Sequence, residues 1–442
     1  MTGPVDAQIR QWRGYLEGRR KLRPEDVDEL ESHLRDTISD LEARGLDGDE
    51  SFLVAVKRMG AADAVAHEFA REHSDRLWKQ LVLGAAEDAA ARRGELPVVL
   101  ALGAGAGLSL LAVLQLLGDV SPRFVAFAVA PFLVAYFAWK RSMPVRGAAI
   151  VLGGFVVTAA VLAAYRFGSG TSTEVLCVVA TPVVLWFGVG VAYTGGAWRS
   201  GPRRMDFVRF TGEYAIYFLL IALGGGAITG LTIGALSTVG LQAETPITTW
   251  VLPVCVGGAV LVAAWLVEAK QEVIENIAPV LTRIFTPITL LMLLVVLVAF
   301  ASRPGLIGVD RDLLVFMTVV LVLVVGLLLY AVSARDPRRR PDVFDRLQVA
   351  LVVAAIAVDL VVLVAMLTRT AEFGASPNKA AVVGLNLILL VILAGAAVLG
   401  VGFVRGRRDF VSVERWQTGT LPAYAAWAAI VALAFPPLFG FR

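Results

Sequence analysis

Charged residues are scarce in this chain of 442 residues, where Asp, Glu, Lys and Arg together make up 17%. An ordinary soluble protein carries about 25% of them. The scarcity is uneven, because residues 1–95 hold fifteen basic and twenty acidic side chains, a net charge of −5, while the remainder carries +8. The two parts therefore belong to different solvents. This division predicts a soluble domain over residues 1–95 and a membrane domain over residues 96–442.

Cysteine and histidine are also rare. The two cysteines, Cys177 and Cys255, lie inside apolar runs and supply neither a disulfide framework nor a metal site. All three histidines fall within residues 1–95, and the spacing of six between His67 and His73 does not place them on one helical face. The chain has no H-E-x-x-H, Walker A, G-x-S-x-G or Cys-x-x-Cys motif. We therefore expect no enzyme activity, no cofactor and no bound metal.

Long apolar runs replace charge over most of the chain, which is 57% hydrophobic. A helix of about 20 apolar residues crosses a hydrocarbon core about 30 Å thick. Eleven such runs follow one another, at residues 96–118, 122–140, 147–165, 175–198, 213–240, 249–268, 280–301, 313–333, 347–367, 381–404 and 421–440. The expected fold is all-α, a small helical bundle followed by about eleven transmembrane helices in a lipid bilayer.

The basic residues between the apolar runs predict the orientation of the chain. With the N-terminus in the cytoplasm, the inside loops hold eighteen Lys and Arg residues and the outside segments hold seven. Cytoplasmic loops of membrane proteins carry such an excess. The odd number of spans then places the C-terminus outside. A nucleic-acid partner is not expected, because the basic excess lies between apolar runs rather than on one soluble face.

The N-terminal domain carries the pattern of amphipathic helices. Its clearest helix runs from Pro24 to about Arg44, where apolar residues recur every three or four positions. These residues are Val27, Leu30, Leu34, Ile38 and Leu41. Acidic residues crowd its first turns, where the helix dipole favours them. Shorter stripes before and after this helix predict a small bundle core.

The runs VDELESHLRD at residues 27–36, LEARG at 41–45 and AVKRMG at 55–60 resemble the bacterial permease-prefix domain, a small signalling domain of the HAAS type. The resemblance covers residues 5–75. It implies a cytosolic module that precedes a membrane domain in a bacterial plasma membrane, and it does not imply a catalytic activity. A cytosolic protein partner of this module is expected to contact Glu29, His33 and Asp36.

The run ENIAPVLTRIFTP at residues 275–287 resembles a family of polytopic bacterial membrane proteins and brings no substrate with it. Charged and apolar residues alternate over residues 268–281, so this segment is either an interfacial amphipathic helix or an extension of the next span. Glu272, Glu275 and Arg283 are candidates for a segment that couples the membrane domain to the cytosolic module.

Asp359 is an acidic residue near the middle of the ninth apolar run. An ionised carboxylate there costs several kcal/mol unless it is paired or hydrated. Two interpretations have equal weight at this point. Asp359 is either a proton- or cation-binding carboxylate in an internal cavity, or a protonated group hydrogen-bonded to a neighbouring helix, with Asn386 as the candidate partner.

Two further acids lie at the ends of apolar runs, Glu213 at the start of the fifth and Glu268 at the end of the sixth. Both positions are near the expected cytoplasmic interface. We expect each side chain to extend to headgroups or water, so neither is a candidate functional residue.

The fifth apolar run is rich in glycine, at positions 224, 225, 226, 230 and 234. Gly226, Gly230 and Gly234 form two overlapping G-x-x-x-G steps, which favour close helix packing within one chain or in a homo-oligomer. The alternative is that Gly224, Gly225 and Gly226 break the helix, as in discontinuous transporter helices.

Two classes of function remain open. The first is a membrane sensor or regulatory scaffold, in which the cytosolic helical domain relays the state of the membrane domain to a partner. The second is a permease or channel that uses Asp359 to handle an ion or small solute. The resemblance and the sparse intramembrane charge favour the first.

Overall fold

The computed structural model describes residues 9, 24–42, 47, 51, 55, 74–168, 170–238, 241–269, 277–302, 311–335 and 339–441, with the backbone alone at 24–27, 29–30, 74–94, 277–281 and 311–312. The chain forms two compact units, Met1–Gly94 and Glu95–Arg442. Throughout the described residues the regular elements are helices, and no strand occurs among them. This confirms the all-α prediction.

In the first unit, helix α2 (Pro24–Glu42) is the element that the sequence predicted most clearly. Pro24 occupies its first position, where the missing N–H costs nothing. Leu34, Ile38 and Leu41 are buried, as expected for the apolar stripe. Helix α5 also begins in this unit, at Ser74, and the other helices expected here lie almost wholly outside the described residues.

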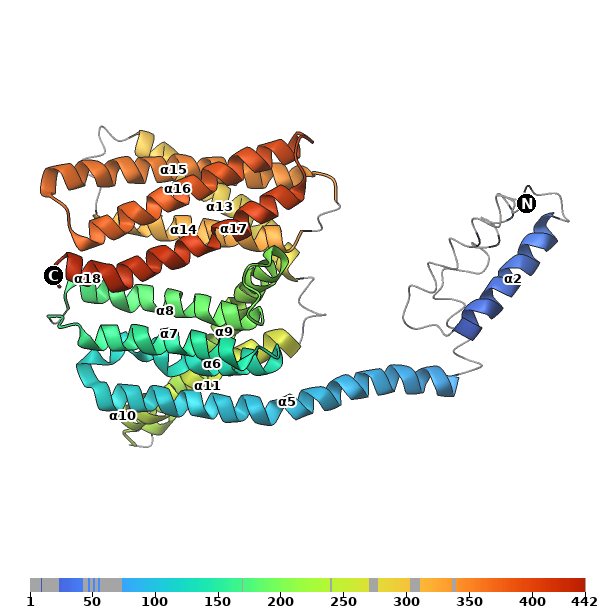
Figure 1. Ribbon diagram of the computed structural model, residues 1–442, viewed down its shortest axis with the longest axis horizontal. Coiled ribbons are helices and arrows are strands. Elements are labelled where there is room, and N and C mark those ends of the chain that lie inside the picture. The colour runs from blue at the N-terminus through green and yellow to red at the C-terminus, as the bar shows by residue number, and fades with distance from the viewer. Residues whose placement is uncertain are drawn as a thin grey trace. The chain divides into compact units, whose positions relative to one another are not determined.

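The second unit consists of helices that overlap the expected apolar runs (Figure 1), although the helix at the fifth run begins twelve residues early, at Gly201, and the helix at the last run begins eleven residues early, at Phe410. In chain order they are α5 (Ser74–Leu117, which enters this unit at Glu95), η1 (Gly118–Arg123), α6 (Val125–Lys140), α7 (Val145–Ala164), α8 (Ser172–Tyr193), α9 (Gly201–Thr238), α10 (Glu244–Pro246), η2 (Ile247–Val251), α11 (Leu252–Ala269), α13 (Ile277–Ala301), α14 (Arg311–Ser333), α15 (Val343–Phe373), α16 (Pro377–Val404), α17 (Phe410–Ala429), η3 (Ile430–Ala434) and α18 (Phe435–Leu438). Ten segments of the described chain are long and apolar enough to span a membrane, and α6 is a shorter apolar helix of 16 residues.

Two large hydrophobic cores and a smaller apolar cluster around Ala432 of η3 hold these helices together. The α6–α8 core joins α5, α6, α7, α8 and α11 and has Phe137, Val189 and Leu261 at its centre. The α14–α16 core joins α13 to α17 and is centred on residues such as Leu321 and Val358. In Figure 1, α8 and α9 lie between the helices of the two cores.

The first half of α9 belongs to both cores. Phe207 and Phe210 pack into the α6–α8 core, whereas Met205 and Val208 pack into the α14–α16 core. Helical periodicity explains this division, because residues one position apart point to different faces. The first half of α9 is therefore the seam between the two cores.

Helix α15 is the most enclosed span and begins with a capping box. The Asp342 carboxylate accepts a hydrogen bond from the Asp345 main-chain N–H, and the Asp345 carboxylate accepts one from Asp342 N–H. Arg335 forms an ion pair with Asp345 at 2.8 Å. Partial burial works to raise the pKa of Asp342. The hydrogen bonds from the main chain and from Asp345, together with the charge of Arg335, outweigh it and lower that pKa.

Candidate functional site

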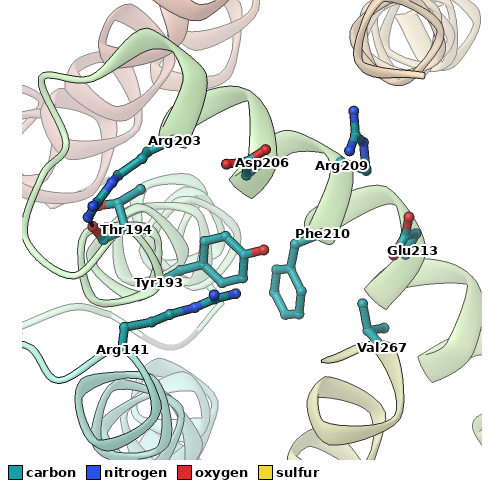
Figure 2. A pocket seen from close by; sticks show the side chains of 9 residues that line it. All are labelled: Arg141, Tyr193, Thr194, Arg203, Asp206, Arg209, Phe210, Glu213 and Val267. Carbon is teal, nitrogen blue, oxygen red and sulfur yellow. Dashed lines mark hydrogen bonds between the residues drawn. The ribbon is translucent and has the colours of Figure 1, made fainter. Parts of the chain in front are cut away.

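A charged pocket of about 460 Å³ opens at the seam, beside the N-terminal part of α9. Its lining is Arg141, Tyr193, Thr194, Arg203, Asp206, Arg209, Phe210, Glu213 and Val267. Figure 2 shows the four charged residues of α9 that line the pocket along one side and Arg141 reaching in from the opposite side. Three cationic and two anionic side chains thus share one cavity.

The turn between α8 and α9 positions the first arginine of α9. Gly195 and Gly196 have φ values of +63° and +84°, a backbone conformation that favours glycine, and they reverse the chain after α8. Arg203 then lies beside that turn and donates a hydrogen bond from Nη1 to the Thr194 carbonyl at 2.8 Å. The turn therefore fixes this guanidinium at the edge of the pocket.

Further along α9, Arg209 and Glu213 are one helical turn apart on the pocket side. Arg209 donates from Nη2 to the carbonyl of Ser333, the last residue of α14. Glu213 is 5% exposed. Arg209 therefore connects the pocket to the α14–α16 core.

Arg141 connects the pocket to α11 on the opposite side. Its Nη2 atom lies 2.9 Å from both carboxylate oxygens of Glu268, and its guanidinium lies 4.7 Å from the centroid of the Tyr193 ring. Lys140 lies 3.8 Å from Glu268 and 3.0 Å from Glu95, near the point where α5 enters this unit. Arg141, Glu268, Lys140 and Glu95 form one series of ion pairs, which we call the ion-pair chain.

Aromatic rings form the floor of the pocket. The rings of Tyr193 and Phe210 are stacked with their centroids 4.7 Å apart, and Phe137 meets Phe210 edge to face at 5.1 Å. Contacts of this kind add about 0.5–1.5 kcal/mol each to simple burial. Helices α6, α8 and α9 are therefore fixed to one another directly beneath the charged groups.

The expectation that Glu213 and Glu268 extend to water was wrong. Both side chains are buried, and Glu268 retains only 3% of its exposure. The reason for Glu268 is Arg141, whose guanidinium supplies a partner inside the bundle. In the sequence the arginines of this region indicated topology only, and the pocket was therefore missed.

Asp359 lies on α15 within the α14–α16 core and is 0% exposed. Among the described residues neither of its carboxylate oxygens has a hydrogen-bond partner. Asn386 donates instead to Thr318 Oγ1 and to the Val382 carbonyl, each at 3.0 Å. The structure therefore does not pair Asp359 with Asn386, and the charged pocket lies elsewhere.

The glycine-rich part of α9 continues the helix, and among the described residues it has no close neighbour. Helix α9 is continuous from Gly201 to Thr238, so the predicted break was wrong. A Cβ atom placed on Gly224, Gly225, Gly226, Gly230 or Gly234 would meet no described atom within 4 Å. Close packing of this face, within the chain or between copies, therefore stays a prediction.

The other expected sites are only partly covered by the structure. Glu272 and Glu275 lie outside the described residues, and Arg283 is exposed on α13. On α2, His33 and Asp36 are exposed, while the side chain of Glu29 is outside the described part. No group of three or more His, Cys, Asp or Glu residues suitable for a metal ion occurs in the described regions.

Comparison with known proteins does not assign this chain to a family. No family model matches the chain, and neither a curated protein nor a solved structure matches it.

Proposed function

We propose that this protein is a membrane sensor or regulatory scaffold of a bacterial plasma membrane, with its N-terminal unit in the cytoplasm. A ligand in the charged pocket changes the arrangement of the membrane helices, and the N-terminal unit relays this change to a cytosolic protein. The observation that supports the proposal is the position of the pocket at the seam of two cores, with the ion-pair chain leading from it to Glu95.

The ion-pair chain offers a physical route for this relay. Arg141 lines the pocket and holds Glu268, so a ligand that competes for its guanidinium weakens that bond. Glu268 then shifts toward Lys140, which in turn holds Glu95. Coupling between sites requires an element that both sites bias. Here that element is α5, which continues from Glu95 back to Ser74 in the N-terminal unit.

Hydrogen exchange on the full chain in lipid nanodiscs tests the relay. Lys140→Gln removes the residue that joins Glu268 to Glu95 in the ion-pair chain, and Arg146→Gln removes an exposed charge nearby that does not line the charged pocket. We expect Lys140→Gln to change amide exchange within residues 1–94 and Arg146→Gln to leave it as in the wild type. A change confined to the surroundings of residues 95, 140 and 268 would refute the relay.

A permease or channel is the second candidate function, and Asp359 favours it. A fully buried carboxyl group without a described partner is a feature of ion and proton sites in membrane proteins. Proton or monovalent-cation flux in liposomes that Asp359→Asn abolishes would establish this function. Absence of flux from folded protein would leave the sensor proposal in place.

A homo-oligomer formed through α9 belongs to the same proposal. The most apolar 18-residue window of α9 contains no buried residue, whereas 56% of the corresponding window in α15 is buried. G-x-x-x-G faces associate closely in membranes. The glycine face of α9 is therefore the surface that a second copy would contact.

A further inference from the structure

Two arginine-rich turns of the second unit lie next to each other. One joins α14 to α15 and the other joins α16 to α17. Residues 334–346 and 405–415 together hold nine basic and five acidic residues. Seven arginines of these stretches are exposed, three in residues 339–346 and four in residues 405–415, and we call them the arginine surface. Asp409 is the exposed acid in the described part of the two turns, so the surface is positive.

Arg335, just after α14, holds the two turns together. Its guanidinium lies 4.6 Å from the ring centroid of Phe403 on α16 and 4.6 Å from that of Phe410 on α17. Its Nη2 atom donates to the main-chain carbonyls of Arg339 and Arg340, at 3.0 and 3.2 Å. One side chain therefore fixes the main chain of the first turn against the two helices that flank the second turn. The arginine surface is thus formed before any ligand arrives.

Two members of the arginine surface continue exposed apolar faces of their helices. On α15, Arg346 lies on one face with three exposed apolar residues, which are Val353, Leu360 and Val364. On α16, which packs against α15, Arg405 lies on one face with Val398, Val391 and Leu387. Exposed apolar faces of membrane helices contact lipid tails, and long basic side chains at their ends extend to the headgroups. The two arginines therefore lie where tails give way to headgroups.

An anionic phospholipid matches both parts of this arrangement. Guanidinium groups bind phosphate well, because their planar N–H donors match two phosphate oxygens. Clusters of basic residues at the end of membrane helices attract anionic lipids for the same reason. An acidic segment of a protein matches the arginines alone, whereas Arg346 and Arg405 are continuous with faces that lipid tails cover. The lipid is therefore the occupant that the geometry favours.

We propose that the arginine surface binds anionic phospholipids, whose phosphates contact arginines of both turns while their tails lie along the exposed faces of α15 and α16. The inference goes beyond the proposed function, because neither the charged pocket nor the ion-pair chain contributes a residue to this surface.

Native mass spectrometry of the full chain from detergent micelles tests the binding directly. The probes are phosphatidylglycerol, phosphatidylethanolamine with the same acyl chains, and the deacylated anionic head glycerophosphoglycerol. We expect phosphatidylglycerol to bind at least tenfold more tightly than either of the others. Equal binding of phosphatidylethanolamine would overturn the selection of an anionic head. Equal binding of the deacylated head would overturn the lipid as the source of the phosphate.

A pair of charge-removing variants locates the binding on the arginine surface. One arginine near a bilayer surface strengthens the binding of anionic lipid about fivefold. Arg346→Gln combined with Arg405→Gln is therefore expected to weaken phosphatidylglycerol binding at least tenfold and to leave phosphatidylethanolamine binding unchanged. The control is Arg146→Gln combined with Arg199→Gln, which removes two exposed arginines from other turns. An equal loss in the control pair would overturn the proposal, because the lipid would then respond to total charge alone.

A charge-retaining pair separates loss of charge from loss of fold. Arg346→Lys combined with Arg405→Lys keeps both positive charges on side chains of similar length. We expect this pair to retain the preference for phosphatidylglycerol over phosphatidylethanolamine. A loss as large as that in the glutamine pair would overturn the assignment of these two charges to the phosphate.

Discussion

The ion pair between Arg141 and Glu268 predicts unequal losses of stability when either partner is removed. The Glu268 side chain is 3% exposed and that of Arg141 is 35% exposed. Removing Arg141 leaves a buried carboxylate whose nearest described cation is Lys140 Nζ at 3.8 Å. Removing the charge of Glu268 leaves a guanidinium that water already reaches. We therefore expect Arg141→Gln to be the more damaging change.

The magnitudes follow from the two limits known for ion pairs. Breaking a fully buried pair costs about 3–5 kcal/mol, whereas an exposed pair contributes about 0.2–1 kcal/mol. Glu268 is near the buried limit and Arg141 is between the two. Arg141→Gln is therefore expected to lower the free energy of unfolding by about 2 kcal/mol, and Glu268→Gln by about 1 kcal/mol or less. The double variant is expected to recover part of the loss.

Unfolding of the purified protein in mixed detergent micelles provides the assay. The two single variants, the double variant and the wild type form a double-mutant cycle, which isolates the coupling between the two side chains. Arg146→Gln serves as the control for loss of a nearby exposed arginine. A loss for Glu268→Gln as large as that for Arg141→Gln, or additive losses in the double variant, would refute the reasoning.

Three further outcomes are expected. Asp342→Ala removes the N-cap of α15 and is expected to lower the free energy of unfolding by about 1 kcal/mol relative to the wild type at pH 7. The pKa of Asp342 is lowered in the folded state. The difference in unfolding free energy between the wild type and Asp342→Ala is therefore present above about pH 4 and disappears as the pH falls through that pKa. Unfolding at several pH values measures it. Gly230→Leu is expected to reduce the yield of cross-linked dimer in membranes. The control is Gly153→Leu, at an open glycine on α7, which is expected to leave the yield unchanged. Equal yields of dimer in the two variants would contradict the α9 interface. Asn386→Leu loses the hydrogen bonds to Thr318 and to the Val382 carbonyl, each worth about 0.6 kcal/mol, but also removes an amide oxygen without a described partner, so we expect the free energy of unfolding to fall by about 1 kcal/mol or less. A loss above about 2 kcal/mol in thermal unfolding would contradict this.

The fold was predictable because the membrane imposes strong and local rules. Apolar runs of about twenty residues gave the positions of the spanning helices, and even the short α6 coincides with its expected run. The periodicity of Leu34, Ile38 and Leu41 identified the buried face of α2 in the same way. Each of these features depends on residues close together in the sequence, so one chain is enough to recognise them.

The charged pocket was not predictable because its members come from separate helices. The α6–α7 turn contributes Arg141, α9 contributes Arg203 and Arg209, and α11 contributes Glu268 as the partner of Arg141. The sequence placed all of these groups at one side of the membrane, but not which helices are neighbours. Opposite charges at the ends of two spans on the same side are the one signal in the sequence that could have indicated such a pairing.

The distribution of polar groups in the second unit connects the pocket with the proposed function. The α14–α16 core keeps Asp359 fully enclosed, whereas the charged groups of α9 surround an open cavity at the seam. A ligand at the seam contacts α9, which belongs to both cores, together with Arg141 of the ion-pair chain. Its binding energy acts on the contact between two packed cores, and a shift of helices against one another is the response that such contacts allow. Enclosed Asp359 has no comparable connection to both cores, so the seam is the better place from which a bound molecule alters the membrane unit.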